Sequence, residues 1–387
     1  MKYLAFYTTD HFRDRQLAVS PAGVSKSAYV AQLLRSTGRP VEIVSPCWSK
    51  CGRWQAWPAA DEPLGDGLTL HQLAAFGVPA RWLTPLQWAF ALWQVFWYLL
   101  RHTRAGEPVA AYHSYYLCLP LLLAKRLRKF RLVLEVEEIY QDITPLPAPV
   151  RWLERRTLAA ADACVISTQE LAGRLPAGRP AVVVNGVYAA EPPRAEPPFD
   201  DGRVHCVYAG TLDPAKGGAA AAVAAAAFLP AGYHVHILGF GSERQKQALL
   251  DQIAQLQPAC RCALSYDGVK QGEAYTRFLQ RCQIGLCTQI PEGAYLKTSF
   301  PSKILGYMAN GLQVVSARIP SVERSAVGDL LCYYDAQTPQ AIAAAICAAA
   351  AQPPAQDPRA RLQALDAQAR RDLRAMLEGL CTAPRKE

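Results

Sequence analysis

Short apolar runs alternate with amphipathic stretches along most of this chain. Residues 3–8 and 41–45 are apolar runs of strand length, and a helical pattern over 24–36 lies between them. This order is typical of a parallel sheet covered by helices. The same alternation continues with strands at 108–113, 131–136, 162–167 and 181–184 and helices at 118–129 and 150–160. The first part of the chain therefore predicts a doubly wound parallel sheet.

A proline-rich segment interrupts this pattern at 191–200, where four of ten residues are proline. Such a segment continues neither a helix nor a central strand. A second α/β series follows, with strands at 204–209, 233–238, 263–266, 283–287 and 312–316 and helices at 217–228, 243–256, 272–281 and 302–310.

The two series predict two Rossmann-like domains of the α/β class, each a doubly wound parallel sheet, facing a central cleft. We expect a first domain at 1–190, a linker at 191–202 and a second domain at 203–352. The Ala-, Leu- and Arg-rich tract within 353–387 predicts a helical tail that packs back toward the first domain.

Composition narrows the class of protein. The 387 residues are 51% hydrophobic, which indicates a globular chain. The twelve cysteines are scattered and form no pair of C-x-x-C motifs, so we expect reduced thiols and no metal site. The first apolar run is too short for a signal peptide, so we expect a cytoplasmic protein.

The distribution of charge and one apolar segment indicate which partners the chain could bind. Of the net charge of +9, residues 1–190 carry +7, with 21 Lys and Arg against 14 Asp and Glu. A basic domain suits an anionic membrane or a phosphorylated acceptor, whereas no nucleic-acid motif accompanies the charge. Residues 83–100 predict a buried helix or one that docks on the inner face of a membrane through Trp88, Trp93 and Trp97. We take 82–104 as the candidate membrane surface; Gln87 and Gln94 disfavour a spanning helix.

Two segments of the second domain suggest an anion site. The strand at 204–209 leads into Gly210, and Lys216 precedes the next helix. Glycine permits close backbone approach to a ligand, and lysine suits a diphosphate, although a solvated turn would look the same. In Ser299-Phe300-Pro301-Ser302-Lys303 the serines can cap amides, and a lysine in the first turn opposes the helix dipole unless an anion binds. The alternative is an ordinary capped helix.

Other strand ends add candidates. Gly239 ends a strand in a G-x-G turn, which is also compatible with a simple tight connection. In the first domain, Glu135, Glu137 and Glu138 end an apolar strand. Clustered carboxylates can act as a base or orient hydroxyls, whereas salt bridges to Arg128, Lys129 and Arg131 are the alternative. His113 ends the preceding strand and is either structural or part of this site.

The order of these motifs resembles the retaining GT-B glycosyltransferases of the "glycosyl transferases group 1" type, in particular bacterial members that build surface polysaccharides. The motifs are Asn185-Gly186-Val187, Ala209-Gly210-Thr211-Leu212 with Lys216-Gly217, Leu238-Gly239-Phe240-Gly241, and Phe300-Pro301-Ser302-Lys303 before Asn310-Gly311. The resemblance covers nearly the whole chain and is strongest from 204 to 316. It implies a hexosyltransferase that moves a sugar from a UDP- or GDP-linked donor to a saccharide or lipid-linked saccharide, without a metal or other cofactor.

The resemblance also implies that 1–190 is the acceptor-side domain and 203–352 the nucleotide-sugar-binding domain, and it implies roles for particular residues. Glu138, Lys216 and Lys303 would be catalytic, and His113 and Glu137 would lie on the acceptor side. The donor would be bound by Gly23, on the loop after the first strand, and by Gly210, Thr211, Gly239, Val269, Ser299, Phe300, Pro301 and Ser302.

The chain departs from the family pattern at positions that would bind two parts of the donor, its nucleoside and its phosphates. Relatives often carry two glutamates eight apart, the second of which binds ribose, where this chain has Thr298 and Gly306. They also often have arginine at the position of Thr211.

Because of these departures, a non-catalytic GT-B partner subunit is an alternative. A nicotinamide-dependent oxidoreductase would need G-x-G-x-x-G after the first strand, and residues 8–23 lack that motif.

Overall fold

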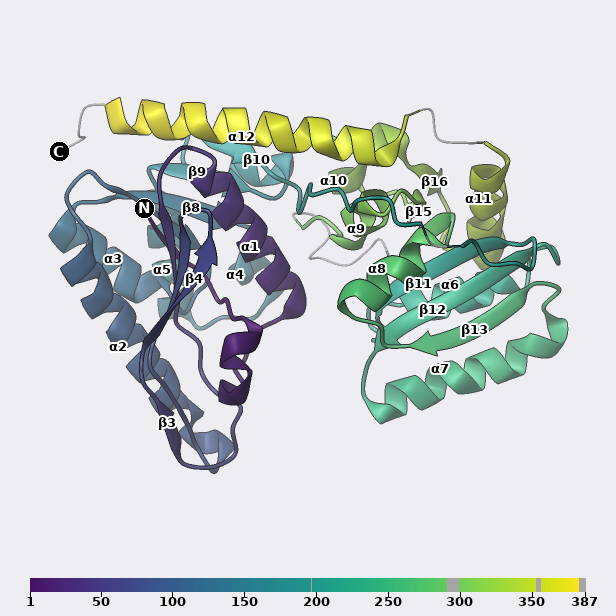
Figure 1. The fold of residues 1–387 in the computed structure, drawn as a ribbon, viewed down its shortest axis with the longest axis horizontal. Helices are drawn as coiled ribbons and strands as arrows, with labels where there is room; N and C mark the ends of the chain where they lie inside the picture. Colours follow the sequence, from purple (N-terminus) through teal and green to yellow (C-terminus); the bar gives the residue numbers. More distant parts are fainter. Residues whose placement is uncertain (196, 291–298, 353–355, 383–387) are drawn as a thin grey trace. The chain divides into compact units, whose positions relative to one another are not determined.

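The computed structural model describes residues 1–387 except 196, 291–298, 353–355 and 383–387. The chain divides into two compact units (Figure 1). Unit 1 comprises Met1–Val184 together with Ala367–Glu387, and unit 2 comprises Asn185–Asp366. The division falls before the proline-rich segment rather than within it.

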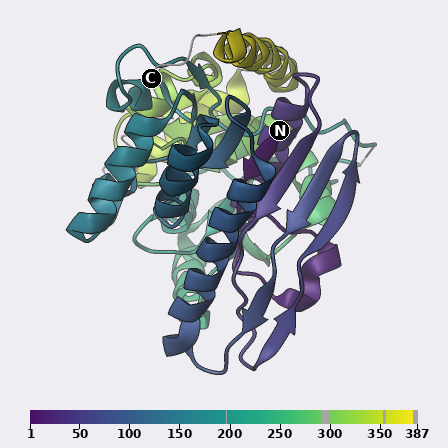
Figure 2. The same cartoon turned by 90° about the vertical axis from the view of Figure 1, so that its left-hand side faces the viewer.

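Unit 1 is built on an eight-stranded sheet in the order β10-β9-β8-β7-β1-β2-β5-β4. All neighbours pair in parallel except β4 and β5, which are antiparallel. Figure 2 shows helices in front of part of this unit, with the first strands of the chain (purple) beside them. The strands are β1 (Lys2–Leu4), β2 (Val41–Ser45), β4 (Ala60–Gly65), β5 (Leu68–Gln72), β7 (Pro108–Tyr112), β8 (Arg131–Val136), β9 (Ala163–Ile166) and β10 (Ala181–Val183). The predicted strands agree with these to within a few residues.

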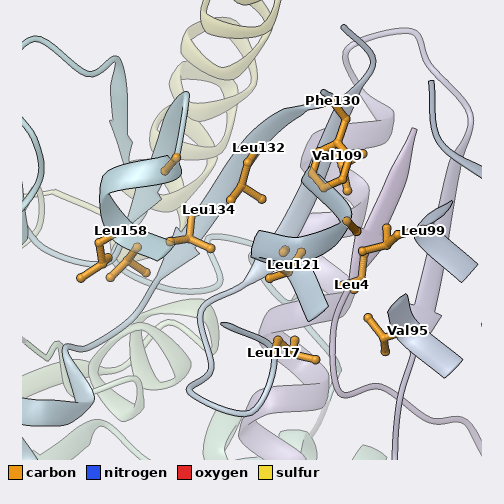
Figure 3. Packing of buried hydrophobic residues seen from close by; sticks show 14 of the residues in the cluster. Leu4, Val95, Leu99, Val109, Leu117, Leu121, Phe130, Leu132, Leu134 and Leu158 are labelled. Carbon is orange, nitrogen blue, oxygen red and sulfur yellow. The ribbon is translucent and has the colours of Figure 1, made fainter. Parts of the chain in front are cut away.

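The helices of unit 1 are α1 (Pro21–Arg35), α2 (Thr84–His102), α3 (Cys118–Arg128), α4 (Tyr140–Ile143), α5 (Ala148–Ala160) and the later part of α12 (Pro358–Thr382). Leu, Val and Ala side chains of α2, α3 and α5 pack together with those of the strands. Figure 3 shows the resulting core, in which Leu4, Leu99 and Leu121 are fully enclosed. Burial of such side chains is the main force that holds a unit of this size together.

The segment between β2 and α2 forms strands that the apolar pattern did not predict. β3 (Gln55–Trp57) pairs with β6 (Ala75–Gly77) in an antiparallel ribbon. The two glutamines of α2 fasten this region to the helix, because Gln87 donates to the carbonyl oxygens of Ser49 and Phe76, and Gln94 bonds the backbone of Ala74. Their presence in an apolar helix thus has a structural cause.

Helix α2 buries one face and exposes the other. Gln87, Ala91, Val95 and Leu99 lie inward at intervals of four residues. Trp93 and Trp97 are exposed, whereas Trp88, predicted to share their face, packs its ring against Trp48 and Tyr116. No helix among the described residues combines the length and hydropathy needed to cross a bilayer.

Unit 2 has a six-stranded, wholly parallel sheet in the order β13-β12-β11-β14-β15-β16. Its strands are β11 (Val204–Thr211), β12 (Tyr233–Phe240), β13 (Ala263–Gly268), β14 (Ile284–Cys287), β15 (Gln313–Ala317) and β16 (Cys332–Tyr334). Its helices are α6 (Gly218–Ala226), α7 (Glu243–Leu256), α8 (Gly272–Gln280), α9 (Lys303–Ala309), α10 (Pro320–Glu323), α11 (Pro339–Ala351) and the first part of α12.

The predicted linker 191–202 lies against unit 2. The amide of Glu191 donates to the carbonyl oxygen of Ala309, and the amide of Arg194 donates to Oε1 of Gln280. Phe199 stacks on His205 with ring centroids 4.0 Å apart. The later part of α12 belongs to unit 1, where Arg374 donates to the carbonyl oxygen of Ser36.

Candidate functional site

The carboxyl ends of the central strands of unit 2 carry the glycines predicted for a ligand site. Because β11 and β12 run in register, Gly210 pairs with Gly239, and Thr211 is the last residue of β11. A Cβ at position 239 would lie 2.5 Å from the carbonyl oxygen of Gly210 and 2.7 Å from Cδ2 of Leu212. Any other residue at 239 would therefore force these strand ends apart.

Lys303, the first residue of α9, brings its amine to this strand end. Nζ lies 3.9 Å from the ring centroid of Tyr208, and a Cβ at position 210 would lie 2.9 Å from Nζ. The residue is partly exposed as a whole. Burial of the amine nevertheless lowers the pKa of Lys303 to about 8; Lys216 adds to the lowering and Cys287 opposes it.

No carboxylate among the described residues pairs with this amine. Across the part of the chain that the structure describes, Nζ of Lys303 makes no hydrogen bond or ion pair. A partly dehydrated cation is unfavourable by itself and becomes favourable when an anion binds. The amine of Lys303 is accordingly the group best suited to receive an anionic ligand.

A tight turn holds the second predicted cation, Lys216. The carbonyl oxygen of Asp213 accepts hydrogen bonds from the amides of Lys216 and Gly217, and Oδ1 of Asp213 accepts from the amide of Ala215. Gly217 has a φ of +64°, which favours glycine, and α6 begins directly after it. Lys216 is exposed, and its charge reaches the amine of Lys303.

Tyr208 is a site residue that the sequence interpretation missed. Its ring lies beneath Nζ of Lys303, and its hydroxyl donates to the carbonyl oxygen of Thr211 over 3.0 Å. A Cβ at Gly218 would lie 2.8 Å from Cε2 of Tyr208. A glycine at the first position of an alanine-rich helix, where alanine is the better helix former, was the available signal for this ring.

The segment before α9 differs in detail from the prediction. Ser302 is the N-cap residue, with φ −54° and ψ −25°, but its side chain accepts no capping hydrogen bond, and Pro301 precedes the cap. Phe300 is buried, and the carbonyl oxygen of Ser299 accepts from Oγ of Ser321. The prediction that Ser302 caps the helix through its side chain is therefore wrong; its backbone is already helical, whereas capping serines are typically extended.

The nucleoside side of the predicted site is open at Gly306. A Cβ at this position of α9 would meet nothing within 4 Å, so the backbone accommodates a larger side chain. The other departure from the family pattern, Thr298, lies outside the described residues.

Apolar side chains stand exposed after the strands of unit 2. Val269, which directly follows β13, is 55% exposed, and Phe240, at the end of β12, is 57% exposed. The hydroxyl of Tyr266 on β13 donates to the carbonyl oxygen of Gly239. This edge thus offers an apolar surface next to the glycine pair.

In unit 1, Gly23 lies in the first turn of α1 and not on the preceding loop as predicted. Ser20 caps this helix, and its Oγ accepts a hydrogen bond from the amide of Gly23 over 3.2 Å. The cap extends the helix three residues beyond the apolar pattern. A Cβ at position 23 would lie 3.7 Å from Oγ of Ser20, which is ordinary contact.

The glutamates at the end of β8 differ in burial, since Glu135 is buried whereas Glu137 and Glu138 are partly exposed. Glu135 is 2% exposed and accepts a hydrogen bond from the hydroxyl of Tyr3. Burial, followed by the charge of Glu137, raises the pKa of Glu135 to about 8. Oε1 of Glu137 lies 3.2 Å from Nζ of Lys26, which also donates to the carbonyl oxygen of Val184. Lys26 therefore balances the charge of Glu137, and its charge opposes the rise in the pKa of Glu135.

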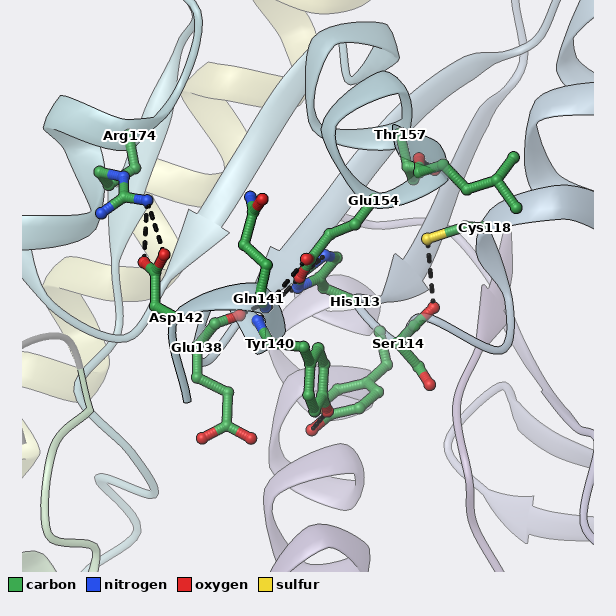
Figure 4. Close-up of polar contacts among 12 residues, drawn as sticks. His113, Ser114, Cys118, Glu138, Tyr140, Gln141, Asp142, Glu154, Thr157 and Arg174 are labelled. Atoms are coloured by element: carbon green, nitrogen blue, oxygen red, sulfur yellow. Dashed lines mark hydrogen bonds and ion pairs between the residues drawn. The ribbon is translucent and has the colours of Figure 1, made fainter. Parts of the chain in front are cut away.

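His113 supports the backbone of Glu138 (Figure 4). Its Nδ1 donates to the carbonyl oxygen of Glu138 over 3.0 Å, and its Nε2 lies 3.5 Å from Oε1 of Glu154. Glu154 in turn accepts from the amides of Tyr140 and Gln141. Burial lowers the pKa of His113 to about 4, so the ring is neutral at physiological pH.

His113 and Glu138 have different roles in this arrangement. His113 is 1% exposed, so it does not reach an acceptor as predicted and instead positions the Glu138 segment. Figure 4 shows the carboxyl group of Glu138 directed away from His113 and Glu154. Glu138 is thus the member of this group whose side chain faces outward.

The described side chains grouped tightly enough to hold a metal ion lie elsewhere. They are His205, His234 and His236, near the start of β11 and β12 and away from the Gly210–Gly239 edge. The sequence interpretation considered cysteine spacing and missed the His-x-His pattern of β12.

No protein-family model and no curated protein matches this chain. Solved structures do match it. One is a trehalose-6-phosphate protein from E. coli bound with UDP-2-fluoro glucose, at 12% identity and a TM-score of 0.65, covering 100% of each chain. Another is an α,α-trehalose 6-phosphate synthase from Burkholderia multivorans, at 14% identity and a TM-score of 0.63, covering 100% of this chain and 99% of the other.

A third similar structure is Alr3699/HepE from Anabaena in complex with UDP. It is 14% identical with a TM-score of 0.62, and the match covers 99% of this chain and 100% of the other. The likeness to all three extends over both units and shows the fold. The chain has the GT-B architecture that the sequence predicts, with two doubly wound, mainly parallel sheets.

Proposed function

We propose that this chain is a glycosyltransferase that moves a hexose from a nucleoside diphosphate donor to an acceptor hydroxyl. The observation that carries the proposal is the amine of Lys303. It is partly dehydrated, next to Gly210, and has a pKa lowered to about 8 by burial and by Lys216. Two lysines beside a glycine near the end of a strand are suited to bind a diphosphate.

The similar structures support the choice of donor. Two of them hold UDP or a UDP-sugar, and a further structure of the Anabaena protein is in complex with UDP-glucose. We therefore favour a UDP-linked hexose over a GDP-linked one. The exposed apolar side chains of Phe240 and Val269 offer a surface against which a nucleobase would pack.

The proposed chemistry is transfer with retention of configuration. The acceptor hydroxyl attacks the anomeric carbon while the bond from that carbon to the diphosphate oxygen breaks on the same face. The hydroxyl proton passes to the departing diphosphate. Lys303 and Lys216 stabilise the negative charge that develops on the leaving group, so that we propose transfer without a metal. Glu138, directed outward from its support by His113, would orient the sugar or the acceptor.

The exposed face of α2 supports an acceptor held at a membrane. Trp93 is 58% exposed, Trp97 is 38% exposed, and Arg101 lies over the ring of Trp97. Tryptophans beside cations are typical of proteins that dock on anionic lipid from the cytoplasmic side. We therefore propose a role in cell-surface polysaccharide or glycolipid assembly. In co-flotation with phosphatidylglycerol vesicles, the chain should float and a Trp93→Ser, Trp97→Ser variant should not; absence of flotation by the wild type contradicts this part.

The function is tested by ligand screening followed by transfer. In a thermal-shift screen of UDP-, GDP- and CMP-sugars, UDP-hexoses should raise the melting temperature, because a ligand that binds the folded state stabilises it by mass action. With the hexose so identified, Lys303→Ala should lower turnover more than tenfold. Lys246→Ala, on the exposed side of α7, is the matched control.

Two outcomes would contradict the proposal differently. Unchanged turnover in Lys303→Ala would remove Lys303 from the reaction. Binding of a UDP-sugar without transfer or donor hydrolysis would favour the partner-subunit alternative, which the absence of a side chain at Gly306 also supports.

A further inference from the structure

Three of the seven histidines of the chain meet on one face of the unit 2 sheet. His234 and His236 lie two residues apart on β12, so their side chains point to the same side. His205 on β11 is the register partner of His234. One ring nitrogen from each histidine lies within 4.8 Å of the others. We propose that this three-histidine cluster binds Zn²⁺.

The outer nitrogen of each of the three rings lies within hydrogen-bond distance of an oxygen atom, so the other, inner nitrogen is the one that could bind a metal. Nε2 of His205 lies 2.9 Å from Oδ1 of Asp201, and Nδ1 of His236 lies 3.1 Å from Oδ2 of Asp267. A carboxylate only accepts, so both of these ring nitrogens carry the proton. Nε2 of His234 lies 3.0 Å from Oγ of Ser265, whose hydroxyl donates to Asp267.

Each ring is thereby fixed in the form that a zinc ligand takes. Metal-binding histidines generally donate their outer nitrogen to a carboxylate or another acceptor, which orients the ring and makes the inner nitrogen a better ligand. Here Asp201, Asp267 and Ser265 are these acceptors. The set of three neutral imidazoles is a ligand set of zinc sites, with a fourth position for water or another group.

The inner nitrogens of His205 and His236 face each other and need a cation between them. Nδ1 of His205 lies 2.9 Å from Nε2 of His236. With the outer nitrogens protonated, both inner atoms present lone pairs, which repel at this distance. A shared proton would satisfy this pair alone, whereas a metal ion would also engage His234, which contributes the third ring nitrogen of the group.

Aromatic rings pack against two of the three histidines. Phe199 stacks on His205 with centroids 4.0 Å apart, and Phe278 of α8 meets His236 edge-on at 5.1 Å. His205 and His236 are buried, while His234 is partly exposed. An ion would therefore reach the cluster at His234, and the fourth ligand position would lie there.

The position of the cluster indicates a structural ion. His205 precedes Gly210 by five residues on β11, a separation of about 17 Å along a strand. The ion would join the 199–201 segment to β11, β12 and β13 at the end of the sheet that does not carry Lys303. This site is independent of the proposed transfer reaction.

The test uses the full chain purified without added metal, treated with a chelator and then titrated with Zn²⁺ or Co²⁺. We expect one high-affinity ion per chain, a rise in melting temperature with Zn²⁺, and a Co²⁺ visible spectrum typical of tetrahedral nitrogen and oxygen ligands. A near-ultraviolet thiolate-to-cobalt band would instead assign the metal to cysteines and overturn the proposal.

Single substitutions test whether these histidines are the residues that bind Zn²⁺. His234→Gln, at the partly exposed ring, should lose high-affinity Zn²⁺ binding while retaining the far-ultraviolet circular dichroism of the wild type. Asp267→Asn should weaken binding about 10- to 100-fold by removing the support of His236. His11→Gln, exposed and in unit 1, is the control. Absence of a Zn²⁺ effect on folded wild type, or equal affinity in His234→Gln, refutes the site and indicates a proton shared between His205 and His236.

Discussion

Replacing Lys303 by methionine should stabilise the free protein while weakening its binding of a UDP-sugar. Methionine keeps the length and apolar stem of the side chain and removes the charge. At neutral pH the difference between the ordinary lysine pKa of 10.5 and a pKa of about 8 corresponds to a cost of about 3 kcal/mol, since each pKa unit is worth about 1.4 kcal/mol. The cation–π contact with Tyr208 offsets about 1–2 kcal/mol of this.

The net expectation is a gain of about 1–2 kcal/mol in the free energy of unfolding of the unliganded protein. For a unit of this size that corresponds to a rise in melting temperature of about 2–8 °C. The same substitution removes a charged hydrogen-bond donor to the diphosphate, and a bond of that kind contributes about 1.5–3 kcal/mol. The dissociation constant for UDP-glucose should therefore increase about 10- to 150-fold.

The sign of the pH dependence gives a second check. Because the folded-state pKa lies below the unfolded-state value, the destabilisation by Lys303 is fully present below pH 8 and disappears as the pH rises toward 10.5. The advantage of Lys303→Met should shrink over this range. The assay is differential scanning calorimetry with and without UDP-glucose, together with isothermal titration, and Lys246→Met is the control. A destabilised Lys303→Met protein, or one that binds UDP-glucose as tightly as wild type, would refute the reasoning.

Two further predictions concern the same site. Binding of UDP-glucose by the wild type should weaken as the pH rises above about 8, by up to about tenfold per pH unit, because Lys303 must be protonated to bind the diphosphate; isothermal titration of wild type and Lys303→Met at pH 7 to 9.5 measures this, and equal slopes in the two proteins would contradict it. Gly306→Glu should strengthen UDP binding severalfold because a carboxylate can accept hydrogen bonds from ribose hydroxyls in the open space at this position; Gly306→Ala controls for helix propensity, and no gain over that control would count against a ribose position there.

The fold was predictable because each strand and helix has a local pattern. The strands at 41–45 and 131–136 and the helix at 243–256 agree with the structure residue for residue. The antiparallel ribbon of β3 and β6 was not predictable from the sequence, because its two short strands are 17 residues apart and carry no alternating pattern. Its stability depends on contacts with α2 that are distant in sequence.

Residues of the candidate site were predictable from the sequence where they lie at or near the carboxyl ends of strands. Gly210, Gly239 and Lys303 meet because parallel strands end at the same edge of a sheet. Burial was not predictable from a motif: His113 is enclosed because Glu154, 41 residues further along, lies beside it. The histidine cluster requires the register of β11 and β12, which only the folded sheet provides.

The discontinuity of unit 1 has a consequence for synthesis on the ribosome. Residues 185–366 contain all of unit 2, whereas unit 1 still lacks its part of α12 until residue 382 has been made. Unit 1 is begun first and completed last, so its final folding step follows translation of unit 2. A fragment designed to carry unit 1 alone therefore needs residues 367–382 joined to 1–184, or supplied as a separate peptide.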